Sequence, residues 1–106
     1  MKASTLLRKA KRVIETKGWT QNKYHTKGDG YCVAGAIVQA EHPKSFKEKS
    51  YFANDRTDGP FKYLRLAIRV RRNYPVSQWN DRHSRTKKQV LAAFDRAIAL
   101  AKEVGD

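Results

Sequence analysis

Eight cationic side chains are the residues of this chain whose types and spacing predict a chemistry, namely the binding of phosphates. Half of them recur every three or four residues along a predicted helix from Pro60 to Arg72, so they share one stripe of its surface. The rest crowd the start of a later predicted helix that opens at Thr86. The two groups are Lys62, Arg65, Arg69 and Arg72, and then Arg82, Arg85, Lys87 and Lys88. Cations grouped in this way are typical of a surface that contacts a polyanion.

Each group also has a structural interpretation. The stripe could simply keep the protein soluble, but solubility does not require a run without any acid between Phe61 and Asn80. Cations near a helix N-terminus each cost a few tenths of a kcal/mol, roughly, because the helix dipole is positive there, and a bound anion reverses that effect. Alternatively, acids such as Asp81 and Asp95 neutralise the second group, or water solvates it. Both interpretations of the second group stay open at this point.

Cys32 supports a different hypothesis, a cysteine-dependent enzyme. The thiol lies near the start of a predicted helix, where its pKa can be lowered, and a histidine could act as its base. Its apolar neighbours favour a small buried cysteine instead. The histidines show no spacing typical of a metal site, and we predict neither a metal nor a cofactor. The candidate bases are His25, His42 and His83, which Asn80 or Asp81 could orient.

Composition sets the class of protein and the class of partner. The 106 residues contain 23 lysines and arginines against 10 acids, a formal net charge of +13, and 40% are hydrophobic. This length and apolar content predict one domain with an ordinary core. A single cysteine excludes an internal disulfide and indicates a reducing, cytoplasmic location. We expect no membrane partner, because no apolar run approaches a membrane span and the first residues do not resemble a signal peptide.

The hydrophobic pattern predicts a mainly helical fold. Apolar residues recur at helical spacing in several segments, and Thr86 with Gln89 matches a capping box. We therefore expect a single compact domain over residues 1–106 with about four helices. Residues 19–60 would hold a small β-hairpin or an irregular insert. The predicted helices run from Ser4 to about Lys17, from about Tyr31 to Ala40, from Pro60 to about Arg72 and from Thr86 to about Val104.

Several short motifs resemble a family of small proteins from actinobacteria and their phages, a domain of unknown function. They are Gly18-Trp19-Thr20-Gln21, Cys32 with Gly35-Ala36, Trp79-Asn80-Asp81, and Arg85-Thr86 ahead of Val90-Leu91 and Asp95-Arg96-Ala97-Ile98. The resemblance implies a helical domain encoded in phage or host genomes, and it assigns no catalytic residue. This chain is rich in lysine and arginine where that family is rich in alanine and acids. We read Trp79-Asn80-Asp81 as a turn that caps backbone groups near the last helix, with Arg85 paired to Asp81.

Three functions follow as hypotheses. The first is a non-enzymatic nucleic-acid-binding accessory protein that contacts phosphates, and in a phage it would act in the host cytoplasm. The second is a small inhibitor or adaptor that docks on an acidic surface of a host protein complex. The third is the Cys32-dependent enzyme. The sequence does not distinguish DNA from RNA, because phosphate contacts carry no sequence information.

Overall fold

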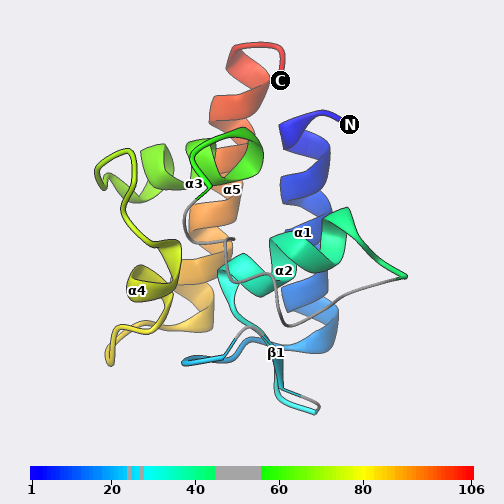
Figure 1. Cartoon of the computed structure of the whole chain (residues 1–106), viewed down its shortest axis with the longest axis vertical. Helices are drawn as coiled ribbons and strands as arrows, with labels where there is room; N and C mark the ends of the chain where they lie inside the picture. Colours follow the sequence, from blue (N-terminus) through cyan, green and yellow to red (C-terminus); the bar gives the residue numbers. More distant parts are fainter. Residues whose placement is uncertain (24, 27, 45–55) are drawn as a thin grey trace.

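Helices dominate the residues that the computed structural model describes, which are 1–23, 25–26, 28–44 and 56–106. Helices α1 and α5 lie side by side and run in opposite directions, α2 crosses α1, and α3 packs on α5 (Figure 1). This arrangement confirms the predicted single, compact, mainly helical domain with a small hairpin. The elements are α1 (Ala3–Lys17), β1 (His25–Thr26), β2 (Gly30–Tyr31), α2 (Val33–Glu41), α3 (Gly59–Ile68), α4 (Val76–Asn80) and α5 (Lys87–Glu103).

The apolar stripes predicted from the sequence form the core. Leu7, Ala10 and Ile14 of α1 have no exposed surface, and Phe94 and Ala97 of α5 are equally buried. Helix α2 is buried nearly throughout, and its small residues allow the neighbouring helices to approach closely. No described helix is both long enough and apolar enough to cross a membrane.

The capping box opens α5 as predicted. The Thr86 hydroxyl accepts a hydrogen bond from the Gln89 N–H, and the Gln89 side chain accepts one from the Thr86 N–H. Helix α2 begins at Val33, two residues later than predicted, and the Cys32 sulfur accepts a hydrogen bond from the Gly35 N–H. Residues 45–55 of the insert predicted over residues 19–60 lie outside the described residues.

Helix α3 corrects the sequence analysis, because it ends at Ile68 and not at Arg72. Arg69 adopts the left-handed conformation, with φ of 60°. The Arg69 N–H bonds to the carbonyl of Leu66, and the next N–H, from Val70, bonds to that of Arg65. These two bonds form the motif that commonly ends a helix at glycine. The sequence offers no glycine there, so helical periodicity alone extended the prediction too far.

Glycines are required where the end of α1 meets the hairpin. Gly30 has φ of +110°, and a Cβ there would lie 2.1 Å from the carbonyl carbon of Gly18. The Tyr31 N–H donates to the Gly18 carbonyl at 3.0 Å, and the Thr20 N–H donates to the Tyr31 carbonyl at 3.1 Å. The hairpin is thereby fixed against the segment that leaves α1.

The side chain of Asn80 joins three separate segments of the chain. Its Oδ1 accepts from the Trp19 indole N–H at 2.7 Å and from the Val33 N–H at the start of α2 at 3.0 Å. Its Nδ2 donates to the Thr20 carbonyl at 3.1 Å and to Asp81 Oδ1 at 2.9 Å. Asn80 therefore caps α2, whereas we had placed this capping near the last helix. The side chain is completely buried, so its contacts exclude water.

Replacement of Asn80 should destabilise the fold. Asn80→Ala leaves the buried Val33 donor and the half-buried Trp19 donor and Thr20 acceptor without their partner, and we expect the free energy of unfolding to fall by roughly 3 kcal/mol. Urea unfolding followed by circular dichroism measures this change. The matched control is Asn73→Ala at an exposed asparagine, which should change it by less than about 0.5 kcal/mol. Equal effects of the two variants would contradict this role for Asn80.

Candidate functional site

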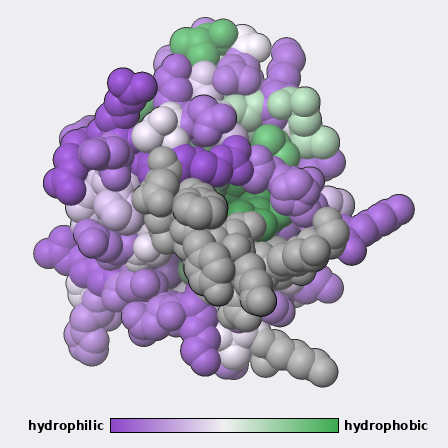
Figure 2. Space-filling view, viewed as in Figure 1, coloured by the Kyte–Doolittle hydropathy of each residue, from purple (hydrophilic) through white to green (hydrophobic). Residues whose placement is uncertain are grey.

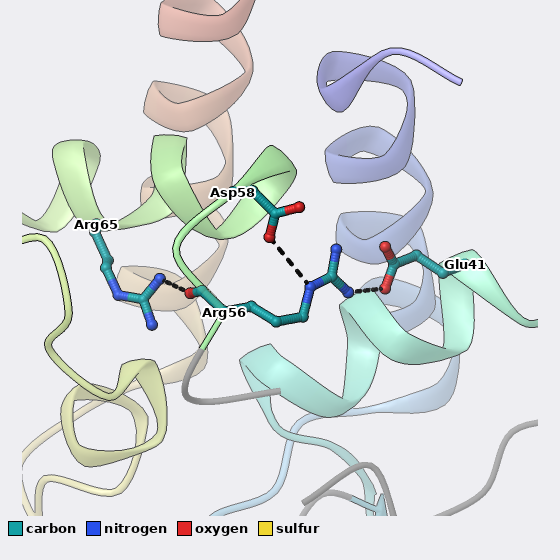
Figure 3. A network of polar contacts seen from close by, with 4 residues as sticks. All are labelled: Glu41, Arg56, Asp58 and Arg65. Carbon is teal, nitrogen blue, oxygen red and sulfur yellow. Dashed lines mark hydrogen bonds and ion pairs between the residues drawn. The ribbon is translucent and has the colours of Figure 1, made fainter. Parts of the chain in front are cut away.

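Arg65, one of the eight predicted phosphate contacts, lies inside the protein. Its side chain is 2% exposed. Its Nε donates to the Tyr74 carbonyl at 2.7 Å, and its Nη1 donates to the Arg56 carbonyl (Figure 3). The expectation that it faces water is wrong, because it satisfies carbonyls of segments on either side of α3. We therefore leave Arg65 out of the candidate surface.

Arg56, whose carbonyl accepts from Arg65, also forms a network of contacts with its own side chain. Arg56 Nη1 bonds Glu41 at the end of α2 at 2.6 Å, and Arg56 Nε lies 3.6 Å from Asp58 (Figure 3). The Arg56 and Arg65 guanidinium carbons lie 4.9 and 5.9 Å from the centre of the Phe61 ring. These contacts tie α2 to the start of α3.

Lys62 and Arg72 lie together but in mixed electrostatic surroundings. Both are exposed, and both line a hollow of about 590 Å³ beside the start of α3. Asp58 and Asp106 line the same hollow. Asp106 also accepts from the Tyr63 hydroxyl at 2.8 Å, which lowers the pKa of this carboxyl. The acids make this hollow a poor site for a polyanion.

Three arginines from distant parts of the sequence gather in a second hollow, of about 410 Å³, between the end of α3 and α5. They are the exposed Arg69 and Arg96 and the half-buried Arg85, and Trp79 and Gln89 line the same hollow. We call it the arginine groove. Ala67, Ile68 and Ala92 also line it, and no carboxylate does so among the described residues. The structure thus brings together Arg69 and Arg85, one from each predicted group.

Arg85 is held in place before any ligand arrives. Its Nε donates to the Trp79 carbonyl at 2.9 Å, and its guanidinium carbon lies 3.9 Å from the centre of the Trp79 ring. We had expected Arg85 to pair with Asp81, but Asp81 accepts instead from the Asn22 N–H and from Asn80. Burial and the nearby charge of Arg82 lower the pKa of Arg85, and a bound anion would relieve the second effect.

Arg96 is the site residue that the sequence analysis missed. Gln89, Ala92 and Arg96 follow Arg85 at intervals of four, seven and eleven residues, which places them on one face of α5. That spacing was the available signal. Arg96 Nε lies 3.4 Å from the Ala67 carbonyl near the end of α3, a weak bond that links the two walls of the groove. The adjacent Asp95 points to α1, where it pairs with Lys11 at 2.7 Å.

Three more predicted residues extend the cationic surface. Arg82, Lys87 and Lys88 are exposed, and the two lysines are the first residues of α5. We call these three the cationic start of α5. No acid lies in the first turn of the helix. The capping box already satisfies the N–H groups of Thr86 and Gln89.

Carboxylates neutralise few of these cations. The ion pairs that connect described residues use Lys11 and Arg56, and none includes Arg69, Arg85, Arg96 or the cationic start of α5. Hydrophilic residues cover most of the face in Figure 2, including the side where α4 lies. Cations also line α1, including Arg8, Lys9 and Lys17, so the charge alone does not single out one face.

Cys32 has the environment of a structural residue. It is 2% exposed, and its sulfur caps α2. Burial raises the pKa of the Cys32 thiol from its ordinary value of 9.0 to about 11. The thiolate needed for nucleophilic attack is therefore scarce at neutral pH. Among the described residues, no group of three His, Cys, Asp or Glu side chains could hold a metal ion.

Comparison with known proteins gives one match. The model of a protein family, described as a family of unknown function (DUF6197), matches residues 1–100. No curated protein and no solved structure matches the chain.

The inward contacts of Arg65 predict a large loss of stability for Arg65→Met. The substitution leaves the Tyr74 and Arg56 carbonyls without their donor, so the free energy of unfolding should fall by roughly 3 kcal/mol. Arg72→Met, at an exposed arginine nearby, removes the same charge and should change it by less than about 0.5 kcal/mol. Urea denaturation of both variants checks this, and similar stabilities would refute the assignment of Arg65 to the interior.

The raised pKa of Cys32 predicts an alkaline loss of stability. Unfolded chains ionise this thiol near pH 9, whereas the folded protein keeps its proton until about pH 11, so stability falls as the pH rises through this window. The loss should be on the order of 2 kcal/mol. Cys32→Ser keeps a capping oxygen but has no thiol to ionise, and it serves as the control. Parallel stability profiles of the two proteins between these pH values would disprove the shift.

Proposed function

This chain belongs to a protein family of unknown function, DUF6197, and we propose that it is a non-enzymatic accessory protein that binds nucleic acid. The single observation that carries the proposal is the arginine groove, where Arg69, Arg85 and Arg96 meet without a carboxylate. Guanidinium groups suit phosphate oxygens because they are planar, permanently charged and donate in pairs. The origin in actinobacteria or their phages, which the sequence resemblance implies, is part of this proposal.

The charges around the groove support a polymer as the ligand. The residues of the cationic start of α5 are close neighbours of Arg85 in the sequence, and Arg69, at the end of α3, lines the same groove as Arg85. A single small anion would engage only a part of this surface. A nucleic-acid backbone presents phosphates at regular intervals and can engage all of it, releasing counterions at each contact. The net charge of +13 would also speed the encounter with such a partner.

The burial and the raised pKa of Cys32 favour this function over the cysteine-dependent enzyme.

The adaptor is the second candidate, and one observation favours it. Leu66 is 55% exposed, and it lines a further hollow of about 380 Å³ that shares Arg69 and Arg96 with the arginine groove. An apolar side chain of a protein partner would complement Leu66, and an acid beside it could pair with Arg69 or Arg96, although Glu103 also lines this hollow. In that case Leu66→Ala, which adds no charge beside the arginines, should weaken binding of the protein partner and leave nucleic-acid binding intact.

Salt dependence tests the proposed function. We expect the affinity for labelled DNA, measured by fluorescence anisotropy, to fall steeply as KCl increases. Replacing Arg82, Lys87 and Lys88 together by glutamine should reduce the slope of log affinity against log salt by about 2, since up to three phosphate contacts are lost.

The control for this titration is an equal loss of charge elsewhere. Glutamine at Arg8, Lys9 and Lys17 lowers the net charge by the same amount but changes only α1. This variant should keep nearly the full slope. A flat salt response of the wild type would overturn the proposed function. Equal slopes for the two triple variants would show that the cationic start of α5 does not contact the nucleic acid.

A further inference from the structure

We propose that the arginine groove binds single-stranded nucleic acid, with backbone phosphates on Arg69 and Arg96 and one base stacked on the Arg85–Trp79 pair. This inference rests on the proposed function and specifies which form of nucleic acid the groove accepts. Three features of the groove carry it: its length, its stacked guanidinium and the backbone conformation of Arg69.

The groove is long and follows α5. Its lining residues extend from Arg85, just before the helix, to Arg96. Between Gln89 and Arg96, the lining residues that lie within α5, the helix rises about 10 Å, because each residue adds 1.5 Å. One phosphate could not contact both ends, whereas an extended strand can place successive phosphates along it. The volume of about 410 Å³ lies within the range of sites that enclose small ligands, so it has room for a base as well.

The Arg85–Trp79 pair provides a flat platform inside the groove. The guanidinium carbon lies over the Trp79 ring, 3.9 Å from its centre, and the hydrogen bond to the Trp79 carbonyl restrains it further. Arginine planes and aromatic rings are the groups on which proteins stack unpaired bases. In a duplex the bases are already paired and stacked, so they cannot reach this platform. The preference for a single strand follows from that difference.

Arg69, which lines the groove, has a backbone conformation that arginine rarely adopts. Its φ of 60° is the position at which a helix usually ends on glycine, so the fold tolerates an avoidable strain. Strain of this kind concentrates at ligand sites. A glycine would end α3 equally well but would remove a cation from the groove. Arg69 has no carboxylate partner among the described residues, which leaves its guanidinium available to a ligand.

An acidic peptide is the competing occupant. Its carboxylates could pair with Arg69 and Arg96, but it offers no planar group to stack on the guanidinium that lies over Trp79. The observations therefore favour a ligand that combines anions with planar rings.

Abasic DNA gives the sharpest test with the wild-type protein. An abasic strand of the same length keeps every phosphate and lacks the bases. We expect it to bind about tenfold more weakly than the normal strand, at an unchanged salt slope, because one stacking contact is lost. The duplex of the same sequence should also bind more weakly than the normal strand. Fluorescence anisotropy at several KCl concentrations measures all three affinities.

Two variants of Arg69 separate its charge from its backbone strain. Arg69→Gln removes the charge and keeps the strained backbone, whereas Arg69→Gly removes both. Both should lower the salt slope for the single strand by about 0.7, the share of one contact. Only Arg69→Gly should raise Tm, by about 4 °C. Arg8→Gln, which removes an exposed cation of α1, should alter neither quantity.

The outcomes distinguish this inference from the proposed function. Equal affinity for the normal and the abasic strand, or for the strand and the duplex, would overturn the inference while salt-dependent binding leaves the proposed function standing. Displacement of the strand by polyglutamate at equal charge concentration would assign the groove to an acidic protein and overturn it too. If neither strand nor duplex binds in a salt-dependent way, the proposed function itself fails.

Discussion

The buried amide of Asn80 is the interaction on which the rest of this structure depends. A small domain with an excess of positive charge needs contacts that are insensitive to self-repulsion, and a buried amide with both ends satisfied is such a contact. Its oxygen accepts from Trp19 and from the first N–H of α2, and its nitrogen donates to Thr20. The segment after α1, the start of α2 and the end of α4 thus meet at one side chain.

The geometry of the candidate site depends on the contacts of Asn80. Asn80 is the last residue of α4, so fixing it also fixes its neighbour Trp79. Trp79 in turn holds Arg85 through its ring and its carbonyl. The opposite wall of the groove is set by the early end of α3 at Arg69. An uncharged buried network therefore aligns charged groups that would otherwise repel one another.

The sequence predicted best where the determinants are local. The capping box at Thr86 and the apolar stripes of α1 and α5 are confirmed, because neighbouring residues in the chain decide them. The fate of Arg65 was not predictable in this way. Its acceptors belong to Arg56 and Tyr74, which reach it only through the folding of the segments before and after α3. Helical periodicity placed it on a water-facing stripe, and long-range contacts placed it inside.

The candidate site shows the same division. Arg69 and Arg85 were identified as cations of two separate groups, but their meeting in one groove depends on how α3 packs on α5. The left-handed end of α3 could not be foreseen, since the residue there is an arginine and not a glycine. Arg96 lay within reach of the sequence analysis, because it shares the helical face that begins at Arg85.

What would separate the proposed binding surface from a cationic coat is organisation, and the exposed cations of this molecule differ in that respect. The exposed cations of α1 are spread along a helix whose partner α5 supplies Asp95 to Lys11. Asp95 and Arg96 are adjacent in sequence, yet the acid turns to α1 and the arginine to the groove. The carboxylate nearest in sequence is thereby kept away from the three arginines. A coat for solubility has no need of that separation, nor of an arginine stacked on a tryptophan, whereas a surface that must leave its cations free for phosphates needs both.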